Sequence, residues 1–207
     1  MTISALASAG STLVLAGATF SSVRSASRSA AAAERLVQAG LRPVLTPSRA
    51  EDDTQKVMWA DGQKAMLPGG CGYAEVVDEV LYLAMSLRNI NTGIGVLQGW
   101  EPAPQRRLSN EPHADPREFR PQTRDLYIPA GEIGYWHAAI RDQQDPALEV
   151  LRVATEKREA LGIDLLYTDH EGGQRTISRF AMHPREADDL WFLTVSRHWS
   201  LDRPDPR

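Results

Sequence analysis

The sequence predicts a mainly β protein, an antiparallel β-sandwich of about eight or nine strands preceded by a long N-terminal helix. Three observations lead to this prediction. Residues 1–23 carry no charged side chain, and residues 25–39 are rich in helix-forming alanine. From Pro43 onward apolar and polar residues alternate, which is the pattern of half-buried strands. These runs are short and joined by turns rich in Gly and Asp, which favours antiparallel pairing over a parallel α/β sheet.

Length and composition exclude several classes of protein. With 207 residues, 42% of them hydrophobic and 24% charged, the chain suits one well-cored domain, and this excludes wholesale disorder, collagen and multi-span membrane proteins. The single cysteine, Cys71, excludes internal disulfides and any CxxC site. Residues 24–50 have a formal charge of +4 and the remaining residues −8. The acidic remainder argues against a nucleic-acid-binding domain.

Residues 3–22 are expected to form a single-pass transmembrane helix. Residues 3–20 hold six strongly apolar side chains among Ala, Gly, Ser and Thr, and these contribute about −2 to −4 kcal/mol of insertion free energy. A cleaved secretory signal is disfavoured because no basic residue precedes Leu6. A buried helix of a soluble protein is the other interpretation. Because the arginines follow the apolar segment, the positive-inside rule places the globular part in the cytoplasm.

The helix is expected to continue through residues 25–39, since Gly40 and Pro43 are typical of a helix end. A continuous helix over residues 3–39 would be about 55 Å long. We therefore divide the chain into a membrane anchor with a basic helical stem, residues 1–42, and a β-sandwich domain, residues 43–207.

Each strand is predicted from its alternation. The clearest run places Leu81, Leu83, Met85 and Leu87 on one face of a half-buried strand. Further strands are expected at residues 56–59, 64–67, 94–100, 131–141, 163–167, 175–182 and from 191 onward. One inserted helix is expected near residues 146–160, because Asp145 suits the N-cap, Pro146 the first turn, and Gly162 the residue beyond its end.

Residues 101–124 form a predicted proline-rich loop. Its five prolines exclude a central strand or a long helix. Connections of this length are usually functional or disordered, and we expect a passive linker. Replacement of residues 103–121 by a short Gly/Ser linker should then leave the melting temperature nearly unchanged. The alternative is a partner-binding loop with Phe119 as its apolar anchor and five arginines that meet an acidic partner. Those arginines are Arg106, Arg107, Arg117, Arg120 and Arg124.

Four parts of the chain resemble segments of a known group of proteins. They are residues 33–44, residues 87–95, residues 128–132 and residues 169–180. Together they resemble uncharacterised bacterial proteins that have an N-terminal single membrane helix, a basic helical stem and a C-terminal Ig-like β-sandwich domain. The resemblance implies an Ig-like arrangement of the strands and brings no catalytic residue and no cofactor.

No residue pattern indicates catalysis, a metal site or a cofactor. The five histidines lack the spacing of metalloproteases or zinc modules. Residues 169–171, Asp-His-Glu, are interpreted as a solvated turn. Cys71 lies in a glycine-rich loop, residues 68–72, with no histidine nearby and no P-loop signature, and no GxSxG sequence occurs. The five tryptophans are expected in the core and not in a ligand cage.

We therefore expect a non-enzymatic interaction or scaffold protein, held at the inner face of the membrane through residues 3–22, with a protein partner and no nucleic acid. The alternative is a small enzyme whose histidines and aspartates converge from separate strands. A concave pocket that gathers at least two of five side chains would favour the enzyme, and their dispersal would favour binding. These five are His137, His170, His183, Asp164 and Asp169.

Overall fold

The computed structural model describes residues 3–103, 111–186 and 188–203. It divides the chain into two units, residues 1–40 and residues 41–207, which are described separately. The first unit is helical, and the second contains all the strands.

Helix α1 (Ile3–Leu41) is a single helix of 39 residues, where the sequence predicted a helix over residues 3–39. Within the described part of the chain, no helix combines the length and the apolar character needed to cross a membrane. The cause lies in composition, because Ala, Gly, Ser and Thr dilute the strongly apolar residues of the predicted anchor, residues 3–22. Farther along α1, Phe20 and Val23 are exposed, as are Leu36 and Val37.

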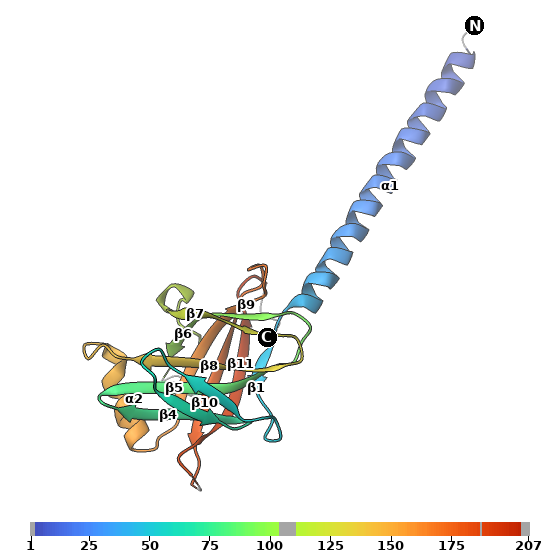
Figure 1. Cartoon of the computed structure of the whole chain (residues 1–207). Helices are drawn as coiled ribbons and strands as arrows, with labels where there is room; N and C mark the ends of the chain where they lie inside the picture. The colour runs from blue at the N-terminus through green and yellow to red at the C-terminus, as the bar shows by residue number, and fades with distance from the viewer. Residues whose placement is uncertain (1–2, 104–110, 187, 204–207) are drawn as a thin grey trace. The chain divides into compact units, whose positions relative to one another are not determined.

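The second unit is built mainly from antiparallel strands (Figure 1). Its strands are β1 (Leu45–Pro47), β2 (Gln55–Met58), β3 (Lys64–Leu67), β4 (Cys71–Val77), β5 (Val80–Asn89), β6 (Gly95–Pro102), β7 (Arg120–Ile128), β8 (Ile133–Ile140), β9 (Leu161–Thr168), β10 (Thr176–Pro184) and β11 (Trp191–Ser200). A short 3-10 helix, η1 (Pro116–Glu118), precedes β7, and helix α2 (Pro146–Glu156) lies between β8 and β9. Asp145 caps α2 by accepting a hydrogen bond from the amide of Ala147, as the sequence predicted.

Nine of these strands belong to one curled sheet, in the order β1-β5-β4-β11-β10-β9-β6-β7, with β8 also paired to β5. Strands β2 and β3 form a separate hairpin. The mainly β, antiparallel prediction is therefore confirmed, but the pairing does not show the two facing sheets of an Ig-like sandwich. Strand β5 pairs with β1, β4 and β8, and the nine strands form one sheet that curls around a common core.

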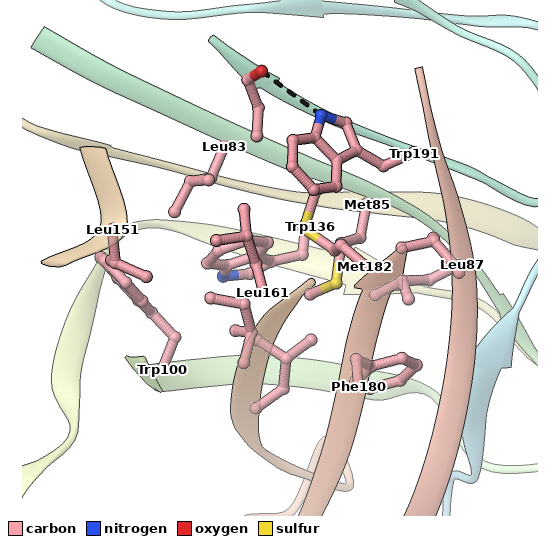
Figure 2. Packing of buried hydrophobic residues seen from close by; sticks show 14 of the residues in the cluster. Leu83, Met85, Leu87, Trp100, Trp136, Leu151, Leu161, Phe180, Met182 and Trp191 are labelled. Carbon is pink, nitrogen blue, oxygen red and sulfur yellow. Dashed lines mark hydrogen bonds between the residues drawn. The ribbon is translucent and has the colours of Figure 1, made fainter. Parts of the chain in front are cut away.

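The core fills the inside of the curled sheet (Figure 2). Leu83 and Met85 of β5 are fully buried there, as the alternation of this strand predicted. They pack with Trp136 of β8 and Met182 of β10, while Leu151 of α2 belongs to the same cluster. The centre of this core is occupied by packed side chains.

Strand β5 is buried on both faces, so its prediction as a half-buried strand is wrong. The β2–β3 hairpin covers the outer face of β5, where Val57 and Trp59 pack against Tyr82 and Ala84. Alternation marks one buried face of a strand, but it does not show that a separate hairpin covers the other.

The proline-rich segment packs on the outside of the sheet, so the passive-linker prediction is wrong for its described residues 111–124. Ala114 and Phe119 are buried against Ile177 and Trp199, and Phe119 therefore contacts the sheet and not a partner. Strands β6 and β7 occupy both ends of the predicted loop, which shortens the connection to residues 103–119. The predicted partner contacts of residues 106 and 107 lie outside the described residues.

Arg179 of β10 fixes this segment. Its guanidinium donates hydrogen bonds to the carbonyl oxygens of Glu111 (2.9 Å) and Pro112 (3.3 Å). It also forms a two-armed ion pair with Asp164 of β9, with both N–O distances 2.8 Å. Both charged side chains are buried, and the guanidinium lies 4.9 Å from the ring centroid of Trp199.

Candidate interaction groove

Four hollows of the described structure are each lined by at most one of the five side chains that the enzyme alternative names, and His170 and Asp169 share the turn after β9. His137 lines a small pocket into which none of the other four named residues extends. Asp164 is held by Arg179, and His183 lies 3.1 Å from the hydroxyl of Thr194. Asp169 accepts a hydrogen bond from the amide of Gly173 and so closes its own turn.

The remaining sequence candidates have structural roles. His198 lies 2.5 Å from Ser178, whose hydroxyl lies 2.8 Å from that of Tyr167, in a polar chain at the wall of the core. Burial raises the pKa of Tyr167 to about 12. Cys71 is buried. The five tryptophans are all buried, as predicted. Among the described residues, no group of three or more His, Cys, Asp or Glu side chains could hold a metal ion.

Strand β4 presents an open edge, which the sequence did not predict. Strands β4 and β5 form an antiparallel hairpin in which Val77 and Val80 flank a two-residue turn, and both turn residues have positive φ. The residues that flank such a turn form a hydrogen-bonded pair, and every second residue of a strand directs its backbone groups to the same side. The amide and carbonyl groups of Val77 and Glu75 therefore point toward β5. Ala74 and Val76 therefore direct their amide and carbonyl groups to the opposite side.

Strand β11 pairs with β4 only at Cys71 and Gly72 within the described chain, so no strand pairs with this edge from Ala74 onward. The carbonyl oxygen of Ala74, which is buried, accepts a hydrogen bond from the indole N–H of Trp191 (3.4 Å; Figure 2), and the unpaired part of the edge is therefore centred on Val76.

The edge stays open because the chain before β11 is held away from it. Arg158 follows α2 in a left-handed conformation, with φ of 56°. Its guanidinium lies 5.0 Å from the ring centroid of Trp191, the first residue of β11. The same group donates hydrogen bonds of 2.8 to 3.2 Å to the carbonyl oxygens of Arg185, Asp188, Asp189 and Leu190. These bonds fix the turn before β11 and keep it from continuing along β4.

A groove of about 630 Å³ lies between the open edge of β4 and the C-terminal end of α2. We call it the β4 groove. Its volume falls within the usual range of ligand sites, about 300–1,000 Å³. Six residues form its apolar and neutral lining, namely Met66, Tyr73, Ala74, Val76, Thr155 and Leu190. Met66 is 60% exposed, and the Thr155 hydroxyl is buried without a hydrogen-bond partner in the described structure.

The charges at the groove are mainly acidic. Glu75, Glu156 and Asp189 lie along it, whereas Arg158 is the basic residue of its lining and is committed to the turn before β11. Glu75 accepts a hydrogen bond from the hydroxyl of Tyr73. Burial, together with this bond, raises the pKa of Tyr73 to about 12, so the phenol keeps its proton at neutral pH. The groove is therefore suited to an extended segment with apolar and basic side chains.

No protein-family model, curated protein or solved structure matches this chain. The resemblance to bacterial proteins with an Ig-like domain therefore stays a hypothesis, and the function has to be argued from the groove itself.

Proposed function

We propose that this chain is a non-enzymatic interaction or scaffold protein whose β domain binds an extended segment of a protein partner in the β4 groove. The observation that carries the proposal is the part of the β4 edge around Val76 that no strand pairs, beside a groove lined by Met66 and Leu190. An added strand would form main-chain hydrogen bonds with this edge, and its alternate side chains would enter the groove.

The test uses a synthetic extended peptide with alternating valine and lysine, labelled for fluorescence anisotropy, and the full chain. We expect binding that Val76→Pro weakens about tenfold, because this change removes one donor at the open edge and is tolerated at an edge strand. Glu156→Lys should also weaken binding, since it reverses a charge of the groove. Glu171→Lys is the matched control, because it makes the same charge change on the turn after β9. Equal weakening by Glu156→Lys and Glu171→Lys would reduce the binding to general charge attraction and contradict the proposal.

As part of the same proposal, residues 3–22 attach the chain to the membrane, with the β domain on the cytoplasmic side. The arginines that follow this segment support the orientation. The direct test is fractionation with a carbonate wash, in which the full chain should stay in the membrane pellet and a chain that begins at Arg24 should be soluble. Recovery of both in the supernatant would refute the attachment while leaving the groove untouched.

A further inference from the structure

A second hollow, distinct from the β4 groove, lies between β7 and β8. These two strands follow each other in sequence, but β7 pairs with β6 and β8 with β5, so their other edges face each other across a gap. The side-chain amide of Gln122 on β7 bridges the gap by donating to the carbonyl oxygen of His137 on β8, at 3.0 Å. We call this hollow the β7–β8 slot. Six of its lining residues matter here, namely Trp59, Trp100, Gln122, Arg124, His137 and Arg141.

Unpartnered polar atoms concentrate in this slot. His137 is 6% exposed, and neither of its ring nitrogens has a hydrogen-bond partner in the described structure. The side-chain oxygen of Gln122 is also buried without a partner. The ring of Trp59 packs on that of His137, with centroids 5.6 Å apart, and its indole N–H is already used by the carbonyl oxygen of Ala138. Because buried polar groups are normally hydrogen-bonded, three such atoms in one place indicate an occupant.

The size of the slot limits that occupant. Its volume is about 80 Å³, well below the 300–1,000 Å³ or so of sites for larger ligands. At about 30 Å³ for each water, it holds two or three waters or one group of similar size.

The charges and hydrogen-bonding groups that line the slot indicate the chemical nature of its occupant. Arg124 and Arg141 line the slot, and the acidic group beside them, Asp61, is paired with Arg141 at 2.7 Å and accepts a hydrogen bond from Tyr82. Burial, together with Arg124 and Arg141, lowers the pKa of His137 to about 4, so its imidazole is neutral at neutral pH and lies in a positive surrounding. Such a surrounding favours an anion. The Gln122 oxygen, however, is an acceptor and needs a donor from the same occupant.

We propose that the β7–β8 slot binds a phosphate group that carries one proton, with His137, Arg124 and Arg141 facing its oxygens and the Gln122 oxygen accepting its P–OH. A phosphate of this kind offers acceptors and a donor together, which a carboxylate or a sulfate at neutral pH does not. The proposal is independent of the β4 groove.

The experiment follows the ring signal of His137 by NMR in the full chain, identified by its loss in His137→Gln, while inorganic phosphate, sulfate, formate or chloride is added. Bound phosphate should raise the pKa of His137, because an anion favours the imidazolium. Phosphate should bind about tenfold more tightly than sulfate, since sulfate leaves the Gln122 oxygen unpaired. Gln122→Met should remove this preference.

Arg124→Gln should weaken phosphate binding about tenfold, as expected for a charge-assisted hydrogen bond. Arg117→Gln is the matched control, because the Arg117 side chain is 92% exposed on η1, and it should leave the affinity unchanged. Melting curves of the variants establish that each one folds. A His137 signal that responds to none of the anions would show that the slot holds water, and equal affinities for phosphate and sulfate would refute the role of Gln122. Either result would overturn the proposal.

Discussion

Replacing Arg179 by methionine should destabilise the β domain strongly. This side chain joins the proline-rich segment to the sheet, because it pairs with the buried carboxylate of Asp164 and donates to two carbonyl oxygens of that segment. Arg179→Met replaces the charged side chain by an apolar one of similar length. It leaves the charge of Asp164 buried with no cationic partner, and it leaves the carbonyl groups of Glu111 and Pro112 without their donor.

The magnitude follows from the burial of the pair. The side chains of Arg179 and Asp164 are 2% and 0% exposed, so neither charge can be compensated by water without opening the structure. Removing one partner of such a pair costs about 3–5 kcal/mol. For a chain of this size each kcal/mol lowers the melting temperature by about 2–4 °C, so we expect a decrease of about 6–20 °C.

Thermal unfolding followed by circular dichroism measures this effect, with the double variant Asp164→Leu, Arg179→Met as the informative comparison. The double variant should be more stable than Arg179→Met, because it removes the unpaired charge as well. The reasoning would be refuted by a melting temperature of Arg179→Met within 2 °C or so of the original chain, or by a double variant less stable than the single one.

Three further predictions concern the core and the pH dependence of stability. Leu83→Asp should prevent folding of the β domain, seen as loss of the cooperative melting transition, because it buries an unpaired charge at a cost of several kcal/mol. The pKa of His137 in the folded chain is about 4, below its ordinary 6.5. The unfolded chain therefore binds this proton more readily, and the free energy of unfolding falls as the pH drops from 6.5 to 4. Urea unfolding should show this loss, up to about 3 kcal/mol, in the original chain and not in His137→Gln. Hydrogen bonds from Tyr82 and Arg141 lower the pKa of Asp61 to about 2, so its contribution to stability is present above pH 3.8 and is lost as the pH falls through 2. Asp61→Asn should therefore lower the melting temperature at neutral pH, and the difference should disappear near pH 2.

The strands and the inserted helix could be predicted because their signals are local. The alternation of residues 81–88 gave both the strand β5 and its inward face, and Asp145 with Pro146 gave the start of α2. The pairing of the strands could not be predicted in the same way. Alternation shows which face of a strand is buried but not which strand lies beside it, so a curled sheet and two facing sheets have similar sequence patterns.

The packing of the proline-rich segment was missed because its apolar residues are few. Ala114 and Phe119 give no periodic pattern, and their partners Ile177 and Trp199 lie on the outer face of strands far along the chain. The β4 groove depends on a similar long-range relation, because the edge is open only where β11 begins too late to cover it. No sequence pattern around Arg158 distinguishes it from a solvent-exposed arginine.

Amide hydrogen exchange, followed residue by residue in the full chain, tests the open edge of β4 most directly. In the free chain we predict that the amides of Val76 and Ala74 exchange faster than those of Tyr73 and Glu75, which bond to β5. Addition of the extended valine–lysine peptide should slow Val76 and Ala74 and leave Tyr73 and Glu75 unchanged. Slow exchange of Val76 before the peptide is added, or no change of Val76 and Ala74 at a peptide concentration that saturates binding, would contradict an interaction surface at this edge.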